Sequence, residues 1–284
     1  MTPIIVTIGA GGRSVEMNRP GEGGAIWCET AEGWWGTPEP KVELTERSSG
    51  DGAHRVPDEA VLYASRVVTL GVVATGPGRD AVAALMDAAT AMAHRTVRVG
   101  VADAGGETWA EGYLSTEWGP EAWPGHQRGT LTIVCPDPRR YGTERVASIV
   151  PTGDAGGGLL YDEGAGYLLL PVQFAGDAPE GNSATLENGG TSTAYPTITV
   201  EGSFPSGVTI THAGGELAYP APIGPGAPLV LDSLTRTATV LGVDVTRALA
   251  RRDFPVVEPG GTVTISALAE GTGTVTATVR DTYI

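Results

Sequence analysis

The chain has 284 residues, of which 41% are apolar, and this matches a folded protein of one large or two ordinary domains. Acidic residues outnumber basic ones by 33 to 18, leaving a net charge of −15, so an electrostatic grip on nucleic acid or on an anionic membrane is disfavoured. The 42 glycines are spread along the whole chain, which favours the many turns of an all-β fold.

The first part of the chain alternates short apolar runs with turn residues. Strands are predicted at residues 4–8, 25–29, 41–45, 65–73, 95–102, 106–115 and 128–135. Between residues 80 and 94 the apolar side chains instead recur at helical spacing and line one face. Asp80 is expected to cap this helix, with His94 and Arg95 at its C-terminal end, where cations suit the helix dipole. We therefore expect a β-domain with one helix over residues 1–142.

The composition and the spacing of predicted strands change after residue 142. A Gly-rich connection at 152–158 precedes short Thr- and Val-rich strands, predicted at residues 167–174, 197–201, 208–212, 228–232, 237–241, 261–267 and 273–280. One short helical turn is expected at 245–251. Strands that recur about every ten residues are typical of a β-sandwich or jelly roll, which we predict for residues 143–284.

No pattern in the sequence points to catalysis. Gly9 and Gly11 follow a strand, but position 14 is Ser and no helix follows, so a tight turn is favoured over a dinucleotide site. The four histidines show no metal-ligand spacing. Acidic residues stand singly in turns, and a carboxylate pair for glycoside hydrolysis is only an alternative. We expect no enzyme, no cofactor and no metal.

Cys28 and Cys135 lie in predicted strands. One bridge between them is an alternative, but two separate, inert thiols are favoured. No stretch reaches the roughly 18 apolar residues of a membrane-spanning helix, and the apolar stretch near the start is shorter than that of a signal peptide. We therefore expect the chain to fold in the cytosol without contact to a membrane.

Four tryptophans lie in Gly- and Pro-containing loops: Trp34, Trp35, Trp118 and Trp123. Exposed tryptophans act as anchors of protein interfaces or as platforms for sugars. The alternative is that they cover the edge of a small core. We take them as candidate interface residues and keep the other two roles open.

Several phrases of the sequence occur in a recognisable order. Residues 66–71, the predicted helix and residues 97–99 are followed by a strand that ends in Cys135, Pro136, Asp137 and Pro138, with Tyr141 behind it. The second half holds Asn-Gly-Gly at 188–190, then residues 195–202, 228–232, 236–240 and 254–260. Together these phrases resemble the distal tail protein family, or minor tail proteins, of long-tailed bacteriophages.

This resemblance implies an N-terminal β-sandwich or split-barrel-like domain with one α-helix at 1–142, and a C-terminal galectin-like β-sandwich at 143–284. It implies a structural protein of the tail tip that forms a homohexameric ring. Expected partners are the tail tube protein, the tape-measure protein and the tail-associated hub protein. The protein is then assembled in the host bacterial cytoplasm and carried in the virion, at the tail tip.

The resemblance also implies that DNA passes through the lumen of the ring without specific binding. Residues 1–142 hold 12 basic and 18 acidic residues, which suits a neutral to acidic wall, and Glu29, Glu32 and Glu39 are candidates for it. A charge that serves only solubility is the alternative. The alternative function is a carbohydrate-binding module that contacts the host cell surface.

Overall fold

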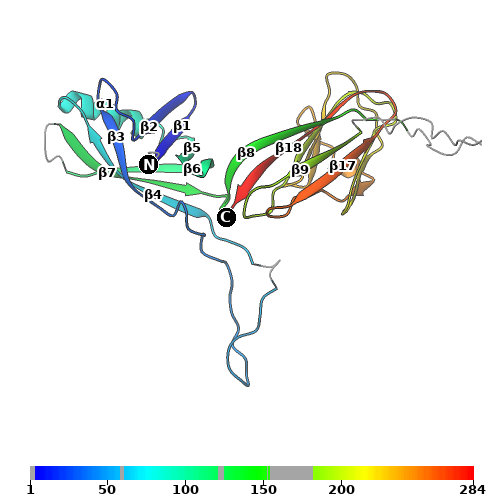
Figure 1. The fold of residues 1–284 in the computed structure, drawn as a ribbon, viewed down its shortest axis with the longest axis horizontal. Helices are drawn as coiled ribbons and strands as arrows, with labels where there is room; N and C mark the ends of the chain where they lie inside the picture. The colour runs from blue at the N-terminus through cyan, green and yellow to red at the C-terminus, as the bar shows by residue number, and fades with distance from the viewer. Residues whose placement is uncertain (1–3, 58–60, 121–124, 152, 154–181) are drawn as a thin grey trace, which may run out of the picture. The chain divides into compact units, whose positions relative to one another are not determined.

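The computed structural model describes residues 4–57, 61–120, 125–151, 153 and 182–284. The chain divides into two compact units (Figure 1). Unit 1 comprises Met1–Thr143 with Tyr283–Ile284, and unit 2 comprises Glu144–Thr282. Each unit has its own hydrophobic core, so each is described by itself.

Unit 1 is an antiparallel sheet with strand order β3-β4-β7-β6-β5-β1-β2. Its strands are β1 (Ile5–Ala10), β2 (Arg13–Met17), β3 (Ala25–Glu32), β4 (Arg66–Thr75), β5 (Thr96–Asp103), β6 (Gly106–Trp118) and β7 (His126–Cys135). Asn18 ties the two edges together, because its N–H donates to Ile26 O at 2.9 Å and its Oδ1 accepts from Cys28 N at 2.8 Å. The sheet therefore curls round one core, as a split barrel does.

The helix α1 (Arg79–Thr90) packs on the inner side of this sheet, against β4, β6 and β7. Its predicted ends were wrong. The N-cap is Gly78 and makes no side-chain hydrogen bond, while Asp80 lies inside the first turn, where a carboxylate favours the dipole without capping. His94 and Arg95 lie beyond the last helical residue. No helix in the described part of the chain is long and apolar enough to cross a bilayer.

Between β3 and β4 the chain leaves the sheet as a long two-stranded loop, which we call the arm (residues 37–57 and 61–65; Figure 1). The strand predicted at 41–45 is wrong. Only two isolated bridges join the described sides of the arm, Pro40 to Tyr63 and Glu46 to Ala53. The alternation at 41–45 misled because none of these side chains is buried against a core.

Unit 2 is a sandwich of two antiparallel sheets. The first has strand order β15-β14-β13-β10-β18-β8, and its strands are β8 (Arg140–Ile149, which begins in unit 1), β10 (Thr197–Ser203), β13 (Leu229–Asp232), β14 (Thr237–Val240), β15 (Val243–Asp244) and β18 (Thr272–Tyr283). The second, five-stranded sheet runs β16-β12-β11-β17-β9, and its strands are β9 (Ser183–Glu187), β11 (Val208–His212), β12 (Gly215–Tyr219), β16 (Arg251–Arg252) and β17 (Thr262–Leu268). Inward side chains of both sheets, such as Ile198 and Ile265, share one core.

The mainly β fold with a single α-helix among the described residues is confirmed. The predicted helical turn is a 3-10 turn, η2 (Thr246–Ala248). Strands β2, β8, β9, β12, β15 and β16 were not predicted. The strand predicted at 167–174 lies outside the described residues.

Candidate functional site

The root of the arm is held by one buried arginine. Arg66 is only 1% exposed, and its Nη1 donates to the carbonyl oxygens of Gly33, Trp34 and Gly36 at 2.6, 3.0 and 2.8 Å. Its Nε donates to Pro138 O at 2.8 Å. Arg66 opens β4, so one side chain joins the outgoing and returning ends of the arm. We call this cluster the arm root.

The turn after β7 completes the arm root. Asp137 accepts a hydrogen bond from Arg139 N at 3.0 Å and another from the Tyr141 hydroxyl at 2.6 Å. Burial, and then the hydrogen bond to Asp137, raise the pKa of Tyr141, so the phenol stays a donor. This turn presents Pro138 O to Arg66. The Cys-x-Asp-Pro phrase and its Tyr therefore form a structural turn.

The arm has little internal support. Near its base, Lys41 N donates to Leu62 O at 2.6 Å and Ala64 N to Glu39 O at 2.8 Å. Leu44 and Leu62 are 61% and 64% exposed. An isolated two-stranded ribbon is marginal in water, and these two exposed leucines make the arm a candidate contact surface.

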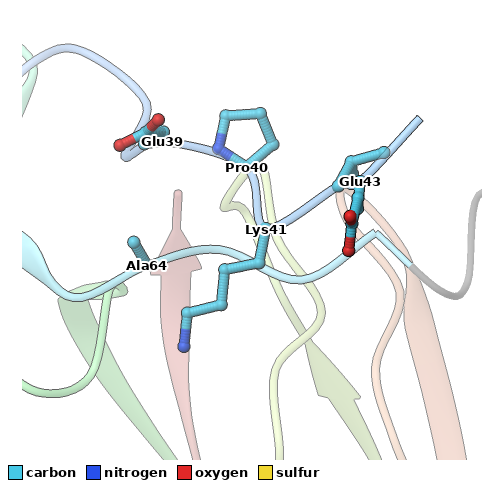
Figure 2. Close-up of a pocket in the computed structure, with 6 residues that line it drawn as sticks. Glu39, Pro40, Lys41, Glu43 and Ala64 are labelled. Atoms are coloured by element: carbon cyan, nitrogen blue, oxygen red, sulfur yellow. The ribbon is translucent and has the colours of Figure 1, made fainter. Parts of the chain in front are cut away.

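One side of the arm base carries an open hollow of about 420 Å³ (Figure 2). It is lined by Glu39, Pro40, Lys41, Val42, Glu43 and Ala64. Lys41, the single lysine of the chain, extends its ammonium past Ala64, while Glu39 and Glu43 flank it in sequence (Figure 2). The hollow thus combines one positive and two negative side chains, and it suits polar contacts with a protein rather than an apolar ligand.

The outer face of the unit 1 sheet starts with an apolar row. Val67, Val134 and Tyr113 are direct neighbours on β4, β7 and β6. Their exposed fractions are 48%, 40% and 60%. Tyrosine in an apolar setting is a common interface anchor, so this row is a second candidate contact surface.

Farther along, the same face is lined by hydroxyl groups. Thr69, Thr132 and Ser115 form one cross-strand row with Glu32, and Thr30, Thr130 and Glu117 belong to the next. Glu29 pairs with Arg128 at 3.8 Å. Glu39 belongs to the arm and not to this face. The hydroxyl-rich face, as we name these two rows, is therefore polar and weakly acidic.

The predicted interface tryptophans occupy different environments. Trp34 is fully buried in the core of unit 1, and Trp118 packs against that core and donates its indole N–H to Thr90 Oγ1 at 3.2 Å. Trp35 is 49% exposed, and its Nε1 donates to Asp103 Oδ2 at 3.1 Å. Trp123 lies outside the described residues. Trp35 therefore stays a candidate interface residue, beside the arm root that sequence reasoning missed.

Both cysteines are free. Cys28 is half-buried and Cys135 is buried, and burial raises the pKa of each thiol to about 11. Among the residues that the structure describes, no group of His, Cys, Asp and Glu side chains is arranged to hold a metal ion.

We expect a thiol reagent to count both cysteines in denaturant without reductant. In the native protein at pH 8 both react slowly, because a thiol with a pKa near 11 is almost wholly protonated there. The measurement is a timed alkylation followed by mass spectrometry. Finding no reactive thiol in denaturant contradicts this prediction.

In unit 2 the Asn-Gly-Gly phrase forms a buried hydrogen-bonded loop. Asn188 is fully buried, and its Nδ2 donates to the carbonyl oxygens of Ser192 at 2.8 Å and Val257 at 3.1 Å. Its Oδ1 accepts from Gly190 N at 3.0 Å and Thr282 N at 3.1 Å. The phrase therefore closes the sandwich and offers no exposed chemistry.

Comparison with solved structures shows what fold these features belong to. The chain is similar to the SPP1 Dit protein, described as a paradigm of the hub adsorption apparatus in phages that infect Gram-positive bacteria, with a TM-score of 0.65 and 14% identity over 98% of this chain and 99% of that one. It is also similar to a chain of the phage p2 baseplate in its activated conformation, with a TM-score of 0.52 in both the Sr and the Ca structure, at 8% and 7% identity over 98% of each chain. No protein-family model and no curated protein sequence matches. At these identities the likeness establishes the fold, over both units.

Proposed function

We propose that this protein is a structural component of a bacteriophage tail tip, where it forms a homohexameric ring that joins the tail tube to the tail-tip hub. The observation that carries this proposal is the likeness to SPP1 Dit, which extends over 98% of this chain and 99% of that one. A likeness confined to one sandwich has little weight, since such folds host many functions. Its partners in this role are the tail tube protein, the tape-measure protein and the tail-associated hub protein.

The architecture of unit 1 supports self-assembly. The arm is too weakly paired to be ordered alone, while the apolar row of Val67, Val134 and Tyr113 stays uncovered within its own chain. In a ring each arm contacts the neighbouring copy, and this buries Leu44 and Leu62. Each leucine then contributes about 1.5–3 kcal/mol on full burial.

We assign the hydroxyl-rich face to the wall of the channel. The hydroxyl groups keep the wall hydrated, and the carboxylates of Glu32 and Glu117 repel the phosphates of DNA. DNA therefore passes along the wall without binding to it. Of the acidic residues expected there, Glu32 fits this face, Glu29 is paired with Arg128, and Glu39 belongs to the arm.

A charge reversal tests the channel assignment. The unmodified protein is expected not to retain duplex DNA at about 0.15 M salt, where the Debye length is about 8 Å. The double variant Glu32→Lys, Glu117→Lys should bind DNA, with an affinity that falls steeply as salt rises. Glu258→Lys with Glu270→Lys makes the same change of charge on exposed residues of unit 2 and should stay inert. Tight DNA binding by the unmodified ring contradicts the assignment.

The proposed place in the virion is tested by labelling. Antibody raised against the purified protein and conjugated to gold should decorate the distal end of the tail in electron micrographs of the parent phage. Label on the capsid, along the whole tail or nowhere on the particle contradicts the proposed location.

The alternative, a carbohydrate-binding module, gains no specific support. No tryptophan lies between residues 144 and 282, and in unit 1 the ring of Trp109 is covered by the Arg98 guanidinium at 3.8 Å and by Tyr141 at 5.1 Å. A glycan array decides between the two functions. Binding that weakens on substitution of Trp35 favours the module.

A further inference from the structure

The arm root contains donors that no described residue satisfies. Trp34 is fully buried and Arg66 is 1% exposed, yet the indole Nε1 and the Nη2 of Arg66 meet no acceptor among the described residues. The Nε of Arg140 is buried and equally unpartnered. A buried donor without an acceptor is destabilising, so several of them together indicate a binding site for an acceptor.

These groups lie around one residue, Trp34, whose backbone carbonyl contacts Arg66 and whose ring lies near Arg140. Arg66 Nη1 is 3.0 Å from Trp34 O, and the guanidinium carbon of Arg140 is 5.6 Å from the centre of the Trp34 ring. Tyr283, also a residue of unit 1, lies near Arg140, with its ring centre 5.7 Å from the guanidinium carbon. The cluster therefore belongs to unit 1 alone.

The charge of the cluster is not balanced by hydrogen-bonded carboxylates. Arg66 donates only to backbone carbonyls, and the Nε of Arg140 meets no acceptor among the described residues. Burial and, to a lesser extent, repulsion from Arg140 lower the pKa of Arg66 to about 10. Asp103 faces Arg140, but its Oδ2 is held by Trp35 and its Oδ1 by Gly105. Leaving buried cations without a counter-charge is costly.

The chemistry of the missing acceptor follows from this donor set. A water molecule accepts two hydrogen bonds but brings two donors of its own, into a cluster that already has donors in excess. A small anion accepts from every direction and carries the missing negative charge. Because Trp34 and Arg66 are almost wholly buried, the site suits an ion of the size of chloride rather than an organic ligand.

We propose that Arg66, Arg140 and the Trp34 indole bind one small anion at the arm root. The ion neutralises the guanidinium groups of Arg140 and of Arg66, which fixes residues 33–36, and so locks both ends of the arm against the sheet. All donors come from one chain, so the site does not depend on ring assembly.

The test compares salts at equal ionic strength in thermal unfolding. Tryptophan fluorescence reports unit 1 alone, because no tryptophan lies in residues 144–282. Replacing sodium gluconate, whose anion is too large for the site, by sodium chloride or bromide should raise the unfolding midpoint of unit 1 by about 4 °C, since a ligand that binds only the native state stabilises it. Far-UV circular dichroism monitors both units, so the part of its transition that fluorescence does not detect belongs to unit 2 and, as an internal control, should not shift.

A matched pair of variants tests whether the halide-dependent shift of the unfolding midpoint comes from the arm root. Arg140→Gln removes one charge from the cluster and should abolish the halide-dependent shift of unit 1. Arg13→Gln, at an exposed position of β2, removes the same charge elsewhere and should keep it. Equal halide responses of the unmodified protein and Arg140→Gln overturn the proposal.

Crystals grown with bromide locate the ion directly. An anomalous peak within hydrogen-bond distance of Arg66 Nη2, Arg140 Nε and Trp34 Nε1 is expected. A water molecule or a protein carboxylate at that position, with no anomalous signal, overturns the proposal even if the protein is stabilised by salt in general.

Discussion

Shortening the arm is expected to abolish the ring and leave a folded monomer. Replacing residues 42–61 by Asn-Gly joins Lys41 to Leu62 through a tight hairpin turn, next to the existing bond from Lys41 N to Leu62 O. The arm root stays intact, because Arg66 contacts only residues outside the deleted segment. Light scattering after size-exclusion chromatography measures the mass of the assembly.

A milder variant is expected to weaken ring assembly without abolishing it. Leu44→Ser with Leu62→Ser removes the exposed apolar side chains of the arm and keeps its length, so we expect weaker assembly, lost first on dilution. Far-UV circular dichroism and tryptophan fluorescence should match those of the unmodified protein in both variants. A shortened-arm protein that assembles as the full chain does contradicts the role given to the arm.

Asn188→Ala is expected to destabilise unit 2 by about 3–5 kcal/mol, because each of several buried groups left without its partner costs about 1–3 kcal/mol. The substitution leaves the N–H groups of Gly190 and Thr282 and the carbonyl of Ser192 without their partner, in a place closed to water. It also opens a cavity beside the C-terminal strand. Urea unfolding followed by far-UV circular dichroism measures the loss.

The location of all six tryptophans outside residues 144–282 makes this prediction selective. The unfolding transition seen by tryptophan fluorescence reports unit 1 and should stay at the same urea concentration in Asn188→Ala. Asn182→Ala, at a half-exposed position before β9, should change stability by less than about 0.5 kcal/mol. If unit 2 of Asn188→Ala unfolds at the same urea concentration as unit 2 of the unmodified protein, the structural role of this loop is contradicted.

Much of the fold was predictable because a strand or helix with one buried face has apolar residues at a regular spacing in the sequence. In β4 the residues Val68, Leu70 and Val72 alternate with half-exposed ones, and β11 has the predicted bounds. The helix was predictable from the spacing of its apolar face. Its ends were not, because Gly78 caps it through backbone geometry alone.

The strands that were not predicted lack a regular spacing of apolar residues or are short. Along β8 only Ile149 is buried, so the strand reads as polar sequence. Residues 41–45 alternate without a core beneath them, and the pattern predicted a strand that does not exist. Alternation marks a strand only where one face is buried, and a single sequence does not reveal which alternations are.

The arm root depends on contacts that local patterns do not encode. Arg66, Gly36 and Pro138 meet across 30 to 72 residues of chain. One signal was available: Arg66 stands in phase with Val68 and Leu70, which places a charged residue on the buried side of its strand. Local pattern does not separate the buried Trp34 from the exposed Trp35 either, because the two are neighbours in the turn that follows β3.

Electron microscopy of the purified protein tests the central claim most directly. The account predicts rings with six-fold symmetry and an open channel, whose wall carries Glu32, Thr69, Thr132 and Ser115. Particles that are only monomers at the concentration of the assembled tail tip, or rings whose channel is lined by arginines, contradict it.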